Sequence, residues 1–349
     1  MQTACFCAVN CYALISGYVG LYSKHRPRSI INLWICVLLY DIASAIALII
    51  VHSLTDRPFP YTTVLFAFFP AFSGQHWYFS VYFVCFFFFP ILNGCLQTLP
   101  RKTIENTLLS VCILLTILDF FFQNRYVAIT YGYSIVWISF LYLLGGYFSK
   151  YQILKNISVK KGLVGYLACT ILLTVCYYAV SFVAQPFWDT ATIQRNFFVY
   201  NNLLVFCAIF LLATFEKLVF PQKICACIRY VAPTTFGVYI IHQSPAFRAA
   251  FLDGKTGWLS AFPFPFSVFA VCGTAVAIFA VCVVIERVCL KVFQILHMDR
   301  LTLFLEQAST HSLSFFKRVL SHVLCIKTID PLAENQSSET IESEQAQPE

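Results

Sequence analysis

The stretch from 73 to 94 constrains the fold most, because it has the length of a membrane span and no charge. It reads SGQHWYFSVYFVCFFFFPILNG, with nine aromatic side chains and one His. An uncharged apolar run of about 20 residues is typical of a transmembrane helix. Trp77 and Tyr78 suit the headgroup layer at its start. Most of its Phe side chains then face lipid, whereas His76, Trp77 and Tyr78 can line a site for a sugar or another polar substrate.

The composition of the whole chain favours the same environment. Of its residues 59% are hydrophobic and 11% are charged, whereas a soluble domain has about 25% charged residues. The net charge of +7 does not indicate nucleic-acid binding, because the basic residues lie in short loops between apolar runs. Most of the 16 Cys residues fall inside those runs, where they behave as small hydrophobic side chains. Cys225 and Cys227 have no second pair at zinc spacing, so the sequence predicts no metal site.

Nine apolar runs divide the chain and predict an all-α fold, a polytopic membrane helix bundle. Each run is long enough to cross a bilayer as a helix. The predicted spans lie near 3–22, 30–52, 75–97, 106–123, 131–149, 162–184, 199–219, 231–250 and 264–290.

The loops between the spans alternate in charge, and this alternation predicts the orientation. Cytoplasmic loops carry an excess of Lys and Arg. Most of the 23 basic residues fall in one alternating set of loops and after the last span. The other set holds only Arg57, Arg125, Arg195, Arg248 and Lys255. We therefore expect a multi-pass protein of the cell membrane with a cytoplasmic C-terminus. Nine spans then place residue 1 outside, so either the short uncharged start crosses the membrane or a first helix is absent from this sequence.

Beyond the last span the chain changes character. Residues 312–327 place Leu313, Phe316 and Leu320 on one helical face, the pattern of an interfacial amphipathic helix. The end of the chain is acidic and rich in Gln and Ser, a composition typical of disorder. The predicted organisation is a membrane bundle over 1–296, a cytoplasmic amphipathic segment over 297–327 and a disordered tail over 328–349.

Two groups of polar residues have both a structural and a functional interpretation. The turn SKHRPRS holds Arg26 and Arg28. It either sets topology and contacts anionic lipid, or clamps the phosphates of a cytosolic donor, since Arg offers phosphate a bidentate fork. Asp41 lies inside the second span, where a carboxylate is costly and is often functional. It either has a structural role, with a local bond to Tyr40 or Ser44, or a catalytic or proton-handling role. His242 lies past the middle of the eighth span and either satisfies an interhelical hydrogen bond or transfers protons.

Two further features concern packing alone. Adjacent Gly145 and Gly146 predict a close approach between helices. Glu286 and Arg287, near the end of the last span, are expected to extend their charged ends toward the headgroups.

Four stretches together resemble the membrane acyltransferase type 3 family, the integral-membrane O-acyltransferases of bacterial surface polysaccharides. The similarity covers about 3–290. The stretches, in family order, are the VNCYALISGY run at 9–18 with the basic turn after it, QHWY at 75–78 with PILN at 90–93, YS at 133–134 with GGY at 145–147, and GVYIIH at 237–242.

The resemblance implies a bundle of ten helices that takes an acyl group, acetyl or succinyl, from acyl-CoA in the cytosol. Acyl-CoA would be a co-substrate, with no metal. The acceptor would be a hydroxyl of a glycan, often on the far side of the membrane. The family also has an earlier helix that carries an Arg and a His, the His being the proposed catalytic base. This sequence starts after that helix, in agreement with the loop charges.

On this hypothesis Arg26 and Arg28 bind the donor phosphates. His242 and His76 are the candidates for proton transfer, and Trp77 and Tyr78 for binding the acceptor sugar. The expected partners are the lipid bilayer and the glycan acceptor, without nucleic acid. Two other functions stay open: a proton-coupled transporter or flippase of a lipid-linked sugar, using Asp41 and His242, and a non-catalytic scaffold descended from an enzyme.

Overall fold

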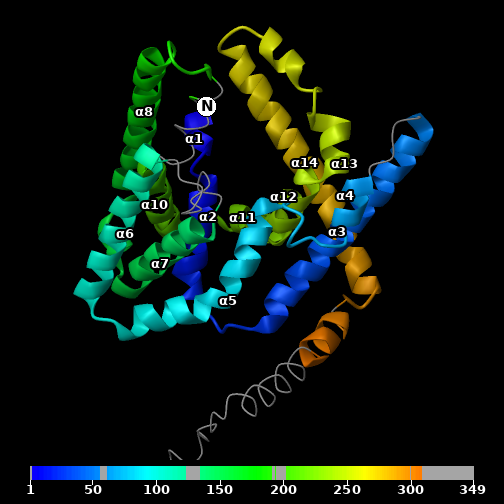
Figure 1. Cartoon of the computed structure of the whole chain (residues 1–349), viewed down its shortest axis with the longest axis horizontal. Coiled ribbons are helices and arrows are strands. Elements are labelled where there is room, and N and C mark those ends of the chain that lie inside the picture. Colours follow the sequence, from blue (N-terminus) through cyan, green and yellow to red (C-terminus); the bar gives the residue numbers. More distant parts are fainter. Residues whose placement is uncertain are drawn as a thin grey trace, which may run out of the picture. The chain divides into compact units, whose positions relative to one another are not determined.

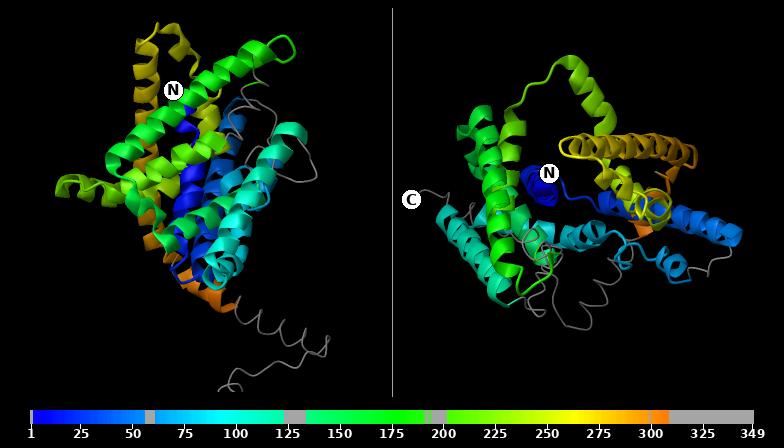
Figure 2. Two further views of the ribbon diagram at one scale, coloured as in Figure 1. Left: turned by 90° about the vertical axis from the view of Figure 1, so that its left-hand side faces the viewer. Right: turned by 90° about the horizontal axis from the view of Figure 1, so that it is seen from above.

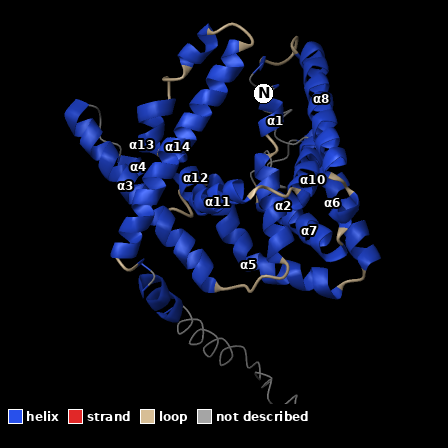
Figure 3. Ribbon diagram, turned by 180° about the vertical axis from the view of Figure 1, so that it is seen from behind, coloured by secondary structure: helices blue, strands red, loops and turns tan. Residues whose placement is uncertain are grey.

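The computed structural model describes residues 2–55, 61–122, 134–190, 193, 202–298 and 300–308. Within these residues every regular element is a helix, which confirms the predicted all-α fold (Figure 3). The chain divides into two compact units, Met1–Phe293 and Gln294–Glu349. The described part of the second unit is mostly helical up to residue 308. The predicted amphipathic helix at 312–327 and the acidic tail at 328–349 lie outside the described residues.

Helices lie in all nine predicted spans, and a further short helix, α4, was not predicted. The bounds of the helices are α1 Gln2–Cys5, α2 Ala8–Gly20, α3 Pro27–Thr55, α4 Tyr61–Phe66, α5 Trp77–Thr98, α6 Arg101–Phe122, α7 Ile135–Tyr151, α8 Val159–Ala184, α10 Asn202–Lys217, α11 Gln222–Val231, α12 Thr235–Gln243, α13 Pro245–Phe247 and α14 Phe266–Ile295. In the described residues α6, α7 and α10 are not among the segments long and apolar enough to cross a membrane. Short 3-10 turns follow α7 and α11, and a π-helical turn, Arg248–Leu252, follows α13.

Six helical segments in the described part of the chain are long and apolar enough to cross a membrane: Thr3–Gly20, Pro27–Leu54, Trp77–Thr98, Val159–Ala184, Gln222–Gln243 and Phe266–Ile295. Two of these segments are interrupted. A turn separates α1 from α2, and a 3-10 turn at Ala232–Thr234 separates α11 from α12. The predicted eighth span, 231–250, therefore overlaps only the second half of Gln222–Gln243, and its regular helix, α12, ends at Gln243. Most large apolar side chains of α8 and α14 are exposed, as lipid-facing helices require.

Sequence signals at the helix starts account for several of these bounds. Pro27 opens α3, a position where its missing N–H costs no helical hydrogen bond. The side chain of Ser134 accepts from the Trp137 N–H at the start of α7, and that of Ser158 accepts from the Lys161 N–H at the start of α8. These contacts satisfy backbone donors that the first helical turn leaves free.

The predicted close approach at the paired glycines is confirmed, and its partner is α2. Figures 1 and 2 show α2 (blue) in the group with α7, α8 and α10 (green), and these helices share one buried core. A Cβ added at Gly145 would lie 2.1 Å from the Leu14 carbonyl oxygen, and one at Gly17 would lie 1.9 Å from the Tyr142 carbonyl oxygen. Only the Cα hydrogen atoms of these glycines fit there, so the backbones of α2 and α7 are in contact without intervening side chains.

A second core forms where α3, α12 and α14 meet the start of α5. Here the expectation for Glu286 is wrong. Its side chain is buried and accepts a hydrogen bond from the Tyr40 hydroxyl on α3. Arg287 packs its guanidinium over the Tyr230 ring, with 3.8 Å between the guanidinium carbon and the ring centroid. Glu286 lies on the face of α14 that meets α3, so it cannot extend toward a headgroup.

Candidate functional site

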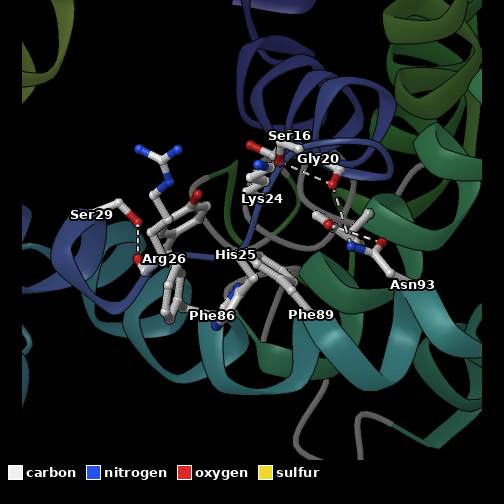
Figure 4. A pocket seen from close by; sticks show the side chains of 12 residues that line it. Ser16, Gly20, Lys24, His25, Arg26, Ser29, Phe86, Phe89 and Asn93 are labelled. Atoms are coloured by element: carbon white, nitrogen blue, oxygen red, sulfur yellow. Dashed lines mark hydrogen bonds between the residues drawn. The ribbon is translucent and has the colours of Figure 1, made fainter. Parts of the chain in front are cut away.

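A cavity of about 120 Å³ opens at the turn between α2 and α3 (Figure 4). Two groups of residues form it. A polar rim comes from the turn and the helix ends beside it, and an aromatic floor comes from α5 and α7. The lining residues are Ser16, Gly20, Ser23, Lys24, His25, Arg26 and Ser29 on the rim, and Tyr82, Phe86, Phe89, Asn93 and Tyr142 on the floor.

The rim carries positive charge at neutral pH from Lys24 and Arg26, but not from His25. The His25 ring stacks on Phe86 with 4.0 Å between ring centroids. Partial burial there lowers the pKa of His25 from its ordinary value of 6.5, because an apolar neighbour disfavours the charged imidazolium. The rim is therefore suited to an anion such as a phosphate, and it gains a third positive charge only under acidic conditions.

The floor of the cavity is held rigidly. Phe89 and Tyr142 stack with 4.0 Å between centroids and 8° between planes. The Tyr142 hydroxyl donates to the Asn93 side-chain oxygen over 3.1 Å, and the Asn93 amide donates to the Gly20 carbonyl over 3.3 Å. Three helices are thus linked at the base of the cavity, so its shape is set before any ligand enters.

Of the two Arg residues predicted to bind a donor, only Arg26 lines this cavity. Arg28 lies half-buried in the first helical turn of α3. Figure 4 shows the Arg26 side chain at the rim, to the left of His25. Lys24, which the sequence analysis did not single out, stands on the same rim. The turn therefore supplies Lys24 and Arg26 as the pair facing the cavity.

A buried His–carboxylate pair lies at the start of α5. The His76 Nε2 atom is 2.7 Å from Asp41 Oδ1 on α3, and neither side chain is exposed to solvent. The second nitrogen, His76 Nδ1, and the second oxygen, Asp41 Oδ2, have no hydrogen-bond partner in the described part of the chain. A His that is oriented by a carboxylate and keeps one ring nitrogen available is the arrangement of a general base.

His242 is placed differently. Its Nδ1 atom lies 2.8 Å from the Val238 carbonyl oxygen and must donate to it, since a carbonyl can only accept. Its Nε2 atom then accepts from the Gln243 side-chain amide over 3.0 Å. Both ring nitrogens are engaged within α12. The structure pairs Asp41 with His76, so the predicted route between Asp41 and His242 is not a direct contact.

Trp77 and Tyr78 are half-buried beside this pair, with 5.6 Å between their ring centroids. The Tyr78 backbone N–H donates to the Tyr239 hydroxyl oxygen over 3.2 Å. One turn further along α5, Tyr82 already lines the cavity. His76 and Tyr82 are six residues apart, which is about 9 Å of helix rise. His76 immediately precedes α5 and Tyr82 belongs to it, so the buried pair and the cavity both adjoin this helix.

Sequence reasoning missed several residues around the cavity and the His76–Asp41 pair. Tyr239 precedes His242 by three positions and shares its helical face, and Tyr142 and Tyr82 belong to aromatic runs that read as lipid-facing. The only available signal was that Tyr78, Tyr82, Phe86, Phe89 and Asn93 recur every three or four residues. That spacing marks one face of α5, but it does not reveal which helix the face meets.

A comparison with models of protein families gives one match for this chain. The model of the acyltransferase 3 family, described as an acyltransferase domain, matches residues 1–287. No curated protein and no solved structure matches the chain significantly. The match covers α1 to α13, the cavity, the buried pair and most of α14.

Proposed function

Since this chain belongs to the membrane acyltransferase type 3 family, we propose that it transfers an acyl group from acyl-CoA to a sugar hydroxyl of a cell-surface polysaccharide. The acyl group is acetyl or succinyl. The observation that carries the proposal is that α5 lines a basic-rimmed cavity and begins at a buried His–carboxylate pair. One place suits an anionic donor and the other suits proton removal from an alcohol.

The residues divide into three roles. Lys24 and Arg26 on the rim bind phosphates of acyl-CoA from the cytoplasmic side. His76 takes the proton of the sugar hydroxyl on its Nδ1 atom, while Asp41 holds the ring and stabilises the imidazolium that forms. Trp77 and Tyr78 flank His76, where their rings can pack against a sugar. The acceptor reaches this centre from the opposite side of the membrane.

The bonds that change follow from these roles. The sugar oxygen attacks the thioester carbonyl, its proton passes to His76, and the carbon–sulfur bond breaks. The same proton then returns from His76 to the CoA thiolate, so the reaction needs no external acid or base. This sequence uses the free ring nitrogen of His76 twice, once as a base and once as an acid.

We expect Arg26→Gln to raise the KM for acyl-CoA about 5- to 10-fold, because it removes one charged hydrogen bond to phosphate from an exposed site. Arg28→Gln should have a smaller effect, since Arg28 does not line the cavity. The measurement is the initial rate of acyl transfer by purified protein against acyl-CoA concentration. Arg229→Gln on α11 is the matched control. An unchanged KM in both Arg26→Gln and Lys24→Gln would remove the donor assignment.

Acidification should strengthen donor binding. The pKa of His25 lies below its ordinary value of 6.5, so the ring is neutral at pH 7 and gains its charge only as the pH falls through the lowered pKa. The third positive charge beside Lys24 and Arg26 then lowers the Kd for CoA a few-fold between pH 7 and pH 5. Calorimetric titration with CoA at several pH values measures this change in Kd. The His25→Gln variant keeps the cavity but has no titratable ring, so the pH dependence of its Kd for CoA should reflect the CoA phosphates alone. The same pH dependence in the parent protein and in this variant would contradict a role of His25 in donor binding.

The flippase alternative makes a different prediction for the cell. If the protein is an acyltransferase, deletion of its gene leaves polymer export intact and removes only the acyl group from the glycan. If it is a flippase, deletion abolishes export, and the protein shows no acyl-CoA turnover. Mass analysis of the surface glycan in a deletion strain therefore separates the two functions.

A further inference from the structure

We propose that the Tyr239 hydroxyl is the oxyanion donor of the acyl-transfer reaction, the group that stabilises negative charge on the thioester carbonyl oxygen. The inference rests on the proposed function and adds a catalytic residue to it. No described contact makes Tyr239 necessary for binding the donor at the rim, because it does not line the cavity.

The first support is the position of the Tyr239 oxygen at the start of α5. It accepts from the N–H of Tyr78, the second residue of that helix, over 3.2 Å. The first N–H groups of a helix have no partners inside the helix, and this end carries partial positive charge. A phenol that accepts one hydrogen bond keeps its own O–H to donate. The Tyr239 O–H is thus polarised by a helix of 22 residues and remains available for a negative acceptor.

The second support is independent and points to a ligand at the same place. His76 is the residue that immediately precedes α5, and its ring lies edge-on to Tyr239 with 6.0 Å between centroids. The side chain of His76 is completely buried, yet Nδ1 has no partner in the described residues, and the same holds for Asp41 Oδ2. Buried polar atoms in proteins are almost always hydrogen-bonded. Two unpaired ones at a helix start indicate a place where a polar substrate group completes the set.

The packing of α12 holds Tyr239 there. Its neighbours Val238, Ile240 and Ile241 are buried in the core that α12 shares with α3 and the start of α5. Asp41 belongs to α3, so one packed unit fixes the Tyr, the carboxylate and the His together. Such a fixed donor costs no reorganisation when the oxyanion forms.

The test is Tyr239→Phe, which keeps the ring and removes only the hydroxyl. We expect kcat to fall about 10²- to 10³-fold, the usual loss of one oxyanion donor, with the KM for acyl-CoA within about two-fold of the parent. Tyr230→Phe is the matched control, because Tyr230 is exposed on α11 and Phe preserves its ring beside Arg287. The unfolding temperature of each variant is measured in the same detergent.

A second readout separates catalysis from a structural role of the hydroxyl. Fluorinated tyrosines at 239 are stronger hydrogen-bond donors of nearly the same shape, so kcat should change in step with fluorination while the unfolding temperature stays constant. A full kcat in Tyr239→Phe, or a kcat insensitive to fluorination, overturns the inference alone if the parent protein transfers acyl groups. A parent that consumes no acyl-CoA with a glycan acceptor overturns the proposed function, and this inference with it.

Discussion

Replacing His76 by Gln should lower kcat for acyl transfer about 10²- to 10⁴-fold, the range expected when a general base is removed. Gln preserves a polar side chain of similar length beside Asp41 but cannot take a proton. The rim is unaffected, so the KM for acyl-CoA should change little. Steady-state kinetics with purified protein measures both quantities, and a melting curve confirms that the variant is folded.

Asp41 and His76 should behave as one unit. Asp41→Asn keeps a hydrogen bond to the ring but no longer stabilises the imidazolium, so we expect a loss of about the same size as for His76→Gln. The double variant should have about the same kcat as either single variant, because removing one member of the pair already removes the catalytic effect of both. His242→Gln is the informative comparison, since both nitrogens of His242 are engaged within α12. A large loss in His242→Gln with near-normal rates in His76→Gln would reverse the assignment of the base.

The second large effect is expected at the contact between α2 and α7. In Gly145→Ala the added carbon would lie 2.1 Å from the Leu14 carbonyl oxygen, which is backbone and cannot rotate away. The two helices must separate, and we expect a loss of about 1–3 kcal/mol or more in the free energy of unfolding. The measurement is the unfolding temperature and the yield of monodisperse protein in detergent.

Gly94→Ala is the matched control for this change. Gly94 also lies inside a helix, yet a Cβ there would meet no heavy atom within 4 Å. Because Ala favours the helix by up to about 1 kcal/mol over Gly, this variant should be as stable as the parent or slightly more so. Equal melting temperatures for the two variants would show that the helices do not approach as closely as described.

Much of the fold could be predicted from the chain alone. Long uncharged apolar runs have few structures open to them in lipid, because every backbone N–H and C=O must be paired within the segment. The runs therefore gave the helices, and Gly145 with Gly146 gave the place of a close contact. Errors arose where a helix is interrupted. The apolar pattern does not mark the turn before α2, and the 3-10 turn at Ala232–Thr234 is marked only by Pro233, which the apolar pattern does not take into account.

The candidate site could be predicted only in part. His76, Trp77 and Tyr78 attracted attention because polar rings at the end of an apolar run are unusual, and His76 does contact a buried carboxylate. The partner of Asp41 could not be predicted, since α3 and α5 are brought together by packing between segments distant in sequence. Arg28 and Glu286 show the same limit. Arg28 was judged by its place in the basic turn and Glu286 by its place along a span, whereas their surroundings depend on which helices meet there.

The sequence by itself determined that this chain is a membrane helix bundle, where its helices lie, and that its motifs match an acyltransferase family. These properties depend on local hydrophobicity and on short patterns, which can be read along the chain. Only the tertiary structure decided that Asp41 pairs with His76, that Lys24 and Arg26 share a cavity, and that Tyr239 reaches the start of α5. The two hydrogen-bonded contacts and the cavity each bring different helices together. In lipid the choice of partner depends on the fit of side chains across helix faces rather than on hydrophobicity, which is similar on every face.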